Sequence, residues 1–261
     1  MEQELNRRNE SITDIQVKNY NKMLGNTEYS FFCEKCKNKG LVAIKVYRDN
    51  DFKIVLQKCD CVERLHAEQS KETSGLKDNF GKFTFENFDT SKDYAKIVLE
   101  KAKENVPTND WFFIGGQIGS GKTHICTAIS EKLLMSATTV KFVSWRDLMS
   151  DLKNGFSGRP TFFDFETFKR VEVLYVDDFL HGKATDFELE KAFEIIDYRY
   201  RNDKKTIISS EMLSSEILQL SQSIGSRIVE KSKGFVCNIK RDTQRNYRLS
   251  NNNQKSLNIK N

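Results

Sequence analysis

The chain has 261 residues, of which 30% are charged and 38% hydrophobic, and 42 Lys and Arg stand against 37 Asp and Glu. A chain of this length can bury a substantial core, which excludes a wholly disordered protein. No apolar run approaches the roughly 18 residues of a membrane span, and the N-terminal stretch is polar, so neither a span nor a secretory signal is predicted. We expect a cytoplasmic protein whose six cysteines are free thiols or metal ligands rather than disulfides.

The formal net charge of +5 is unevenly distributed. From Gly225 to the C-terminus, nine basic residues stand against Glu230 and Asp242, which gives this stretch +7 and leaves −2 for the preceding 224 residues. Such a stretch is either a solvated basic face or a surface that meets phosphate. The sequence keeps both interpretations open.

The N-terminal region holds an expected helix and a cysteine cluster. Residues 1 to about 30 are polar with weakly helical spacing of their apolar residues, which predicts a short amphipathic helix. Within residues 31–61 come a C-x-x-C pair and, 22 residues later, a C-x-C pair. Two segments of β-like sequence, residues 41–47 and 52–56, lie between the pairs.

This cysteine spacing is typical of a small zinc ribbon, in which four thiolates complete a tetrahedral Zn²⁺ site. The predicted zinc ligands are Cys33, Cys36, Cys59 and Cys61. A region this short has too little apolar mass to fold without such a staple. Two alternatives stay open: the thiols are free, or His66, otherwise a helix-surface residue, replaces one thiolate.

Between residues 83 and 249, short apolar runs alternate with helical periods, the pattern of βα units in a parallel sheet. Two helix starts resemble capping boxes, Ser144 with Asp147 and Thr185 with Glu188. Cys126 and Cys237 are expected in the core. The expected strands are residues 111–114, 140–143, 171–176, 206–209 and 235–239.

The strongest chemical motif is a complete G-x-x-x-x-G-K-[ST] loop between an expected strand and an expected helix. Its glycines let backbone N–H groups point at one centre, where the helix N-terminus adds positive potential. Lys122 is predicted to reach the β- and γ-phosphates, and the Thr123 hydroxyl to ligate Mg²⁺. The predicted nucleotide contacts are Gly116, Gln117, Ile118, Gly119, Ser120, Gly121, Lys122, Thr123 and His124.

Two carboxylates, Asp177 and Asp178, end an apolar strand. Carboxylates there are costly unless they serve a cation or a polar centre. In P-loop proteins this strand end carries the Asp that orients Mg²⁺, which nominates Asp177. Asp178 is then placed to orient or deprotonate the attacking water, unless it caps a turn or helix.

Six motifs occur in one order along the chain: TFENF at 84–88, the GQIGSGKT loop, VDD at 176–178, YRY followed by TIISSE within 198–211, GSRIVE at 225–230, and NYRL at 246–249. Together they resemble the AAA+ ATPases of the bacterial and phage DnaC/DnaI helicase-loader group, of which the transposition helper IstB is a close relative. The resemblance covers roughly residues 75–249.

The resemblance implies an α/β AAA+ P-loop core with a parallel five-stranded sheet, and ATP with Mg²⁺ bound between self-associated subunits. It assigns Arg227 as the arginine finger that reaches a neighbour's γ-phosphate, and Arg248 as the sensor-II arginine. It also implies that the N-terminal zinc module grips the replicative helicase hexamer, and that the region after the P-loop helix contacts single-stranded DNA.

That region, residues 140–156, carries Lys141, Arg146 and Lys153 beside aromatic residues, the composition of sequence-tolerant strand binding. Trp145 is either a DNA contact or a core residue. The aromatic run that begins at Phe162 is expected to pack internally.

The sequence departs from the family pattern in two places. Glu211 stands where the sensor-I segment commonly has Asn, and an ionised Glu cannot donate a hydrogen bond to phosphate. Either Ser210 substitutes or sensing is weakened. Asp178 stands where most AAA+ proteins carry Glu, and the shorter side chain predicts slow hydrolysis, as in a nucleotide switch.

We therefore expect an adaptor domain at residues 1–74, an ATPase domain at 75–249 and a disordered tail at 250–261. The predicted function is an ATP-dependent helicase loader with ATP, Mg²⁺ and Zn²⁺ as cofactors. Two alternatives remain: an IstB-like transposition ATPase, and a non-catalytic, nucleotide-switched helicase adaptor.

Overall fold

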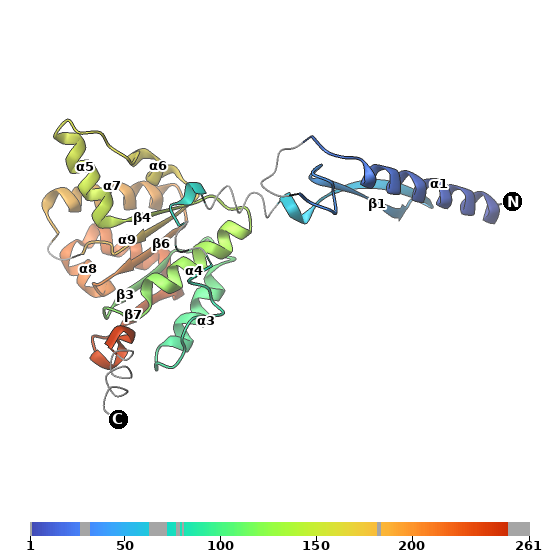
Figure 1. The fold of residues 1–261 in the computed structure, drawn as a ribbon. Coiled ribbons are helices and arrows are strands. Elements are labelled where there is room, and N and C mark those ends of the chain that lie inside the picture. Colours follow the sequence, from blue (N-terminus) through green and yellow to red (C-terminus); the bar gives the residue numbers. More distant parts are fainter. Residues whose placement is uncertain are drawn as a thin grey trace, which may run out of the picture. The chain divides into compact units, whose positions relative to one another are not determined.

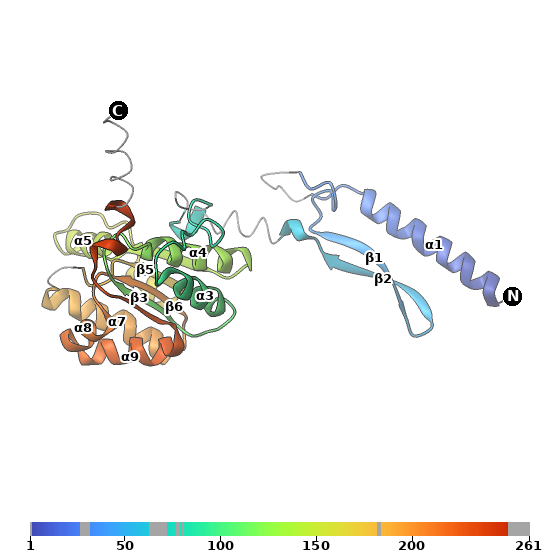
Figure 2. The ribbon, with the colours of Figure 1, turned by 90° about the horizontal axis from the view of Figure 1, so that it is seen from below.

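The computed structural model describes residues 2–26, 32–62, 72–76, 79, 81–181 and 184–249. It divides into two compact units, Met1–Gln69 and Ser70–Asn261 (Figures 1 and 2). His66 and the expected tail at 250–261 lie outside the described residues. Within the described ranges, no helix is long and apolar enough to cross a membrane.

The N-terminal unit consists of helix α1 (Glu2–Lys22) and an antiparallel hairpin of β1 (Leu41–Arg48) and β2 (Asp51–Lys58). Asp49 and Asn50 form the turn with φ of 54° and 60°, the left-handed pair that a two-residue hairpin requires. Figure 2 shows α1 running beside the hairpin.

Side chains of two α1 residues, Asn21 and Asp14, contact the hairpin. The Asn21 amide donates to the carbonyl oxygen of Ala43 over 3.0 Å and accepts from the Ala43 N–H over 2.8 Å. The Lys45 ammonium lies 2.6 Å from the Asp14 carboxylate. Because a two-stranded hairpin is marginal alone, these contacts help α1 to cover one face of it.

The larger unit is built on a parallel five-stranded sheet, as predicted, and the strand order is β4-β5-β6-β3-β7. The five expected strands are all present, with ends shifted by no more than two residues. They are β3 (Phe112–Gly116), β4 (Val140–Ser144), β5 (Val173–Asp177), β6 (Thr206–Ser210) and β7 (Val236–Ile239).

Helices cover both faces of this sheet (Figure 1). One apolar cluster joins α3 and α4 to one face, and a second joins the remaining helices to the other. Cys126 and Cys237 are buried in the first cluster, as expected. The helices are α3 (Ala95–Asn105), α4 (Lys122–Met135), α5 (Trp145–Phe156), α6 (Phe165–Arg170), α7 (Asp186–Arg201), α8 (Ser214–Leu220) and α9 (Gln222–Ser232), with short 3-10 turns η1 (Lys233–Phe235) and η2 (Thr243–Arg245).

Of the two predicted capping boxes, one forms. Thr185 and Glu188 cap each other's backbone at the start of α7. The prediction for Ser144 and Asp147 is wrong, because the Ser144 side chain makes no cap hydrogen bond. Ser144 is the last paired residue of β4, and α5 follows without a loop.

Candidate functional site

The phosphate-binding motif forms the loop between β3 and α4. Gly119 and Gly121 have φ of 70° and 84°, a left-handed backbone that favours glycine. A Cβ on Gly119 would lie 2.1 Å from the side-chain oxygen of Asn246. Since α4 begins at Lys122, its first unpaired N–H groups belong to the loop, as in other anion-binding helix starts.

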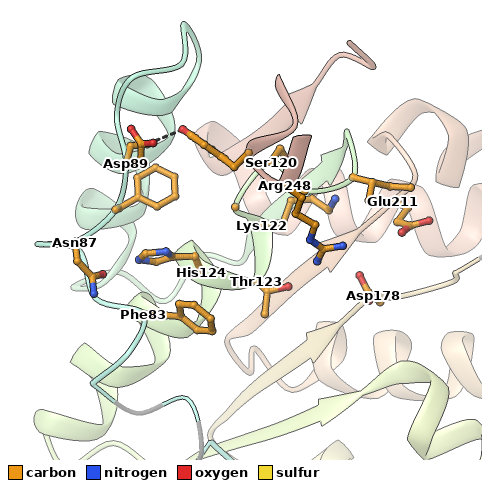
Figure 3. A pocket seen from close by; sticks show the side chains of 15 residues that line it. Phe83, Asn87, Asp89, Ser120, Lys122, Thr123, His124, Asp178, Glu211 and Arg248 are labelled. Atoms are coloured by element: carbon orange, nitrogen blue, oxygen red, sulfur yellow. Dashed lines mark hydrogen bonds between the residues drawn. The ribbon is translucent and has the colours of Figure 1, made fainter. Parts of the chain in front are cut away.

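A pocket of about 410 Å³ opens beside this loop (Figure 3). Its volume lies in the range of small-molecule sites. Gly116, Gln117, Asp177, Ser210 and Arg227 do not line it. The predicted residues that do are Ile118, Gly119, Ser120, Gly121, Lys122, Thr123, His124, Asp178 and Arg248.

Aromatic side chains form one wall of the pocket. The ring centroids of Phe83 and Phe88 each lie 5.1 Å from that of His124. His124 Nε2 lies 2.8 Å from the carbonyl oxygen of Thr84, which fixes the ring. The 84–88 segment carries no local signal for this position: it lies beside the loop, some 30 residues later in the chain, through tertiary packing alone. This wall can stack a planar base.

Lys122 lies at the polar end, and its side chain is buried. Its ammonium donates to the carbonyl oxygens of Gly116 (3.0 Å) and Gln117 (2.8 Å). Burial lowers the pKa of Lys122, against the opposing attraction of Asp178 and Glu211. The ammonium is therefore held at the loop, where a phosphate can exchange for the carbonyl contacts.

Asp177 lies behind the pocket wall in a hydrogen-bond network. Both of its oxygens lie 3.2 Å from the Thr123 hydroxyl, and the buried Tyr175 hydroxyl donates to it over 2.7 Å. The Ser209 hydroxyl also donates to it. Burial raises the pKa of Asp177, and the hydrogen bonds from Ser209 and Tyr175 oppose that rise. The structure thus brings Thr123 and Asp177 together, as the sequence predicted.

Asp178 points into the pocket from the end of β5 (Figure 3). Its φ of 52° is left-handed, an uncommon conformation for a residue with a side chain. Strained backbone of this kind gathers at functional sites.

Ser210 and Glu211 differ in position. Ser210 is fully buried, donates to the carbonyl oxygen of Phe179 over 2.7 Å and accepts from the Met212 N–H. Glu211 lines the pocket, and its carboxylate lies 3.1 Å from His181 Nδ1. The acidic residue, not the serine, therefore faces the pocket at this point.

The segment that carries Arg248 is fastened to the loop. The Tyr247 N–H donates to the carbonyl oxygen of Gly119 over 2.9 Å, and the Tyr94 hydroxyl bonds the carbonyl oxygens of Ser120 and Arg245. These bonds place Arg248 in the pocket wall. The basic C-terminal stretch thus reaches the phosphate loop at this point.

Arg227 lies on α9, outside this pocket. Its guanidinium is 3.0 Å from Asp197 and donates to the carbonyl oxygen of Ser223 over 2.6 Å. It also lies over the rings of Phe193 and Tyr200, at 5.3 and 5.4 Å. Arg227 is therefore engaged by residues of its own chain and contributes nothing to this pocket's wall.

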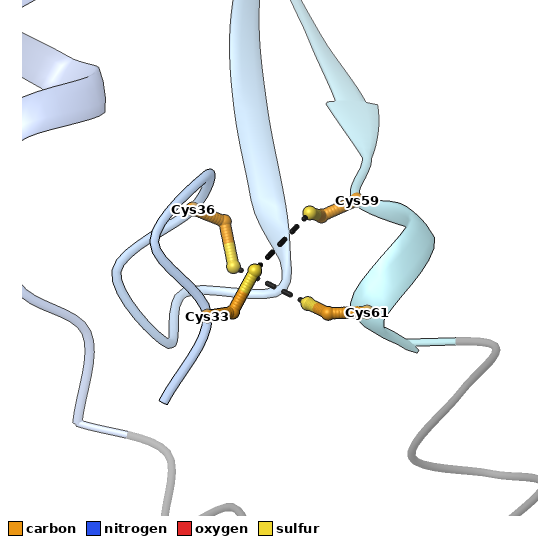
Figure 4. A group of neighbouring side chains, drawn as sticks. All are labelled: Cys33, Cys36, Cys59 and Cys61. Carbon is orange, nitrogen blue, oxygen red and sulfur yellow. Dashed lines mark hydrogen bonds between the residues drawn. The ribbon is translucent and has the colours of Figure 1, made fainter. Parts of the chain in front are cut away.

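In the N-terminal unit the four predicted cysteines meet (Figure 4). Their sulfur atoms all lie within 4.8 Å of one another, with Cys33 to Cys59 at 3.8 Å and Cys36 to Cys61 at 3.3 Å. Burial opposes ionisation of Cys36, but hydrogen bonds from Cys61 and the Gly40 backbone bring its pKa to about 7. This group could hold a metal ion.

The match to a family model decides the relationship of the larger unit. Residues 80–237 match the model of the bacterial DnaA ATPase domain. The chain belongs to this AAA+ family. The DnaC/DnaI-type resemblance predicted from the motifs is thereby confirmed, as is the AAA+ fold.

The proteins similar to this AAA+ chain include two bacterial relatives and a solved structure. The uncharacterized protein YqaM of Bacillus subtilis is 28% identical over 84% of this chain and 86% of its own. The replicative helicase loader DnaC of Buchnera aphidicola is 26% identical over 61% of this chain and 67% of its own. Among solved structures, replication initiator DnaA bound to AMPPCP and single-stranded DNA superimposes with a TM-score of 0.51, at 24% identity. That comparison covers 68% of this chain and 56% of DnaA.

The AAA+ unit decides between the two interpretations of Trp145. Its side chain is 2% exposed and packs edge-on against Phe179, so Trp145 is a core residue. The exposed aromatics lie further along, where Phe156 is 76% and Phe162 is 89% exposed. The expectation that Phe162 packs internally is wrong, because the chain turns it outward after α5.

Proposed function

We propose that this protein is an ATP-dependent loader of the replicative DNA helicase. The observation that carries the proposal is the pocket in which the phosphate loop, the strand-end acid Asp178 and Arg248 face one another, backed by the Thr123–Asp177 pair. The similarity to DnaC, a relative named a replicative helicase loader, supports a role in helicase loading.

The pocket residues divide the work of holding Mg²⁺ and ATP. Lys122 and the loop N–H groups hold the β- and γ-phosphates, while Thr123 and Asp177 hold Mg²⁺, which neutralises phosphate charge. The aromatic wall takes the adenine. Asp178 orients the attacking water. The donor set fits, since hydroxyl and carboxylate oxygens are the ligands that Mg²⁺ prefers.

Self-association completes the site. Arg227, which lies outside its own subunit's pocket, reaches the γ-phosphate of a neighbouring subunit as an arginine finger. Arg201 also contacts Asp197, over 2.6 Å, so this carboxylate keeps a partner when Arg227 leaves it. The half-buried carboxylate thus does not depend on Arg227 alone for a partner.

Glu211 slows ATP hydrolysis in this pocket. Its carboxylate lines the pocket beside Lys122 and Asp178 and, when ionised, cannot donate a hydrogen bond to a phosphate bound there. Turnover far below the ordinary enzyme value of about 10 s⁻¹ is the expected result. The same feature favours a second candidate function, a nucleotide-switched helicase adaptor that does not hydrolyse ATP.

The N-terminal unit binds Zn²⁺ and contacts the helicase. Four sulfurs around Zn²⁺ at about 2.3 Å stand roughly 3.8 Å apart in a tetrahedron, close to the 3.3 and 3.8 Å separations here. Exposed apolar residues on the hairpin, Tyr47, Ile54 and Leu56, offer an adhesive surface to a partner.

Single-stranded DNA binds at the end of α5. Phe156 and Phe162 supply faces for base stacking, and Lys153 lies 5.9 Å from the ring of Phe187, which in turn lies 5.7 Å from Phe156. Asp151 is buried and accepts from the Phe162 N–H over 2.9 Å, which fixes the loop that presents Phe162.

Co-elution with the host's helicase hexamer, with and without ATP, tests the proposal. We expect a complex whose stability changes with ATP, and its loss when the N-terminal unit is deleted. No complex under either condition would refute the loader role. Steady ATP hydrolysis by the wild type that is lost in Lys122→Ala separates the loader from the non-catalytic adaptor.

A further inference from the structure

Ser209 is a buried residue that no motif assigned a role. It lies in β6, one position before the serine at the sensor-I segment, and its side chain is fully buried. Because β5 and β6 pair in parallel, with Val176 opposite Ile208, Ser209 comes level with the strand-end acids.

The Ser209 hydroxyl contacts both acids at once. It donates to the Asp177 carboxylate and accepts from the Asp178 N–H over 3.0 Å. The Ser209 carbonyl oxygen accepts from the Phe179 N–H over 2.8 Å. Ser209 alone thus hydrogen-bonds three consecutive residues, 177 to 179, where β5 passes into the following turn.

These hydrogen bonds hold a residue whose backbone is strained. Asp178 adopts φ of 52°, a left-handed conformation that costs free energy in a residue with a side chain and persists only where surrounding contacts hold it. The N–H of Asp178 has its hydrogen-bond partner in Ser209, so the hydroxyl favours the conformation that turns the Asp178 carboxylate into the pocket.

We propose that Ser209 is the positioning residue that couples the Mg²⁺-binding acid to the water-orienting acid. Through one hydroxyl it fixes the Asp177 carboxylate beside Thr123 and the Asp178 backbone at the pocket edge. This inference rests on the proposed nucleotide function, and it adds a residue that touches neither nucleotide nor metal.

The test compares Ser209→Ala with Ser209→Thr, which keeps a hydroxyl, and with Ser232→Ala as control. Ser232 is also fully buried, and its hydroxyl lacks a hydrogen-bond partner among the described residues. Titration with a fluorescent ATP analogue, in Mg²⁺ and in EDTA, measures how much Mg²⁺ strengthens binding. Hydrolysis gives kcat and KM, and thermal melting reports folding.

For Ser209→Ala we expect the Mg²⁺-dependent gain in affinity and kcat each to fall about tenfold, the scale of one hydrogen bond to a charged group. Affinity in EDTA should stay at the wild-type value. Ser209→Thr should recover most of the loss, and Ser232→Ala should show none.

Equal losses in Mg²⁺ and EDTA, or a lowered melting temperature with unchanged nucleotide binding, would overturn the inference and leave the proposed function intact. A wild-type protein that gains no affinity from Mg²⁺ would instead refute the nucleotide function itself. If Ser209→Ala does not fold, Ser209→Cys fills the site with a slightly larger thiol that is a weaker donor, and the same Mg²⁺-specific loss is expected of it.

Discussion

The N-terminal unit and the ATPase unit bury their cores by different means. In the described part of the N-terminal unit, the core cluster is Cys36, Val42, Cys59 and Cys61, with Cys33 and Val62 against it. The ATPase unit has two extensive apolar layers on opposite faces of its sheet. Three of the four clustered residues in the small unit are metal-type ligands, whereas the large unit needs only apolar packing. The Zn²⁺ site proposed above would account for this contrast, since a bound ion can substitute for hydrophobic mass in a small unit.

Removal of the metal should produce the largest difference in stability between the two units. Structural Zn²⁺ contributes about 10–16 kcal/mol of binding free energy in small zinc modules, far more than the cluster's apolar contacts can replace. We expect a chelator, or Cys33→Ser, to unfold the N-terminal unit while the ATPase unit keeps its thermal transition. Atomic absorption and calorimetry measure this, with Cys126→Ser as a matched change at a core cysteine. A metal-free protein with both transitions intact would contradict the zinc assignment.

Lys122→Ala should affect only the other unit. Loss of the ammonium that meets phosphate is expected to weaken ATP binding tenfold to hundredfold, the scale of about 1.5–3 kcal/mol for a hydrogen bond to a charge. Zinc content should stay at one ion per chain. Nucleotide titration and metal analysis of the same sample provide the measurement, and Lys132→Ala, a change at an exposed lysine of α4, is the control.

Phe156→Ala combined with Phe162→Ala should weaken single-stranded DNA binding about tenfold or more, since base stacking on an aromatic ring contributes about 1–3 kcal/mol per base. Fluorescence anisotropy with an oligonucleotide measures it, and Ile97→Ala, at an exposed apolar residue of α3, is the control. If the double variant binds DNA normally but no longer self-associates, the two rings belong to a protein contact instead.

Two polar substitutions, one in each unit, should have smaller effects, and again the N-terminal unit should lose more thermal stability. Asn21→Ala leaves the Ala43 N–H and carbonyl without their partner and is expected to lower the N-terminal transition by several degrees. Thr185→Ala removes one cap in a much larger unit and should cost about 1 kcal/mol, with a shift of only a few degrees. Calorimetry resolves both, and a larger effect for Thr185→Ala would break the comparison.

Local patterns predicted a large part of this molecule. Each of the five strands contains a short apolar stretch, because a parallel sheet covered on both faces buries side chains on both of its sides. The phosphate loop follows from its own glycines and lysine, and the cysteine cluster from its spacing. The capping box predicted at Ser144 did not form: Ser144 has the extended backbone of an N-cap residue, φ −72° and ψ 128°, but its side chain makes no cap hydrogen bond.

Other features depended on segments far apart in the chain. No pattern distinguished Trp145 from Phe162, because burial depends on how α5 packs against β5 and its following turn.

By itself the sequence determined that this protein carries a phosphate loop, two strand-end acids and a four-cysteine group, since each is a short motif whose chemistry lies in its own residues. Only the tertiary structure decided that Glu211 rather than Ser210 faces the pocket, that Arg227 lies outside it, and that Ser209 joins the two acids. Those relations are set by the pairing of β5 with β6 and by helices that meet only after folding, so no stretch of sequence contains them.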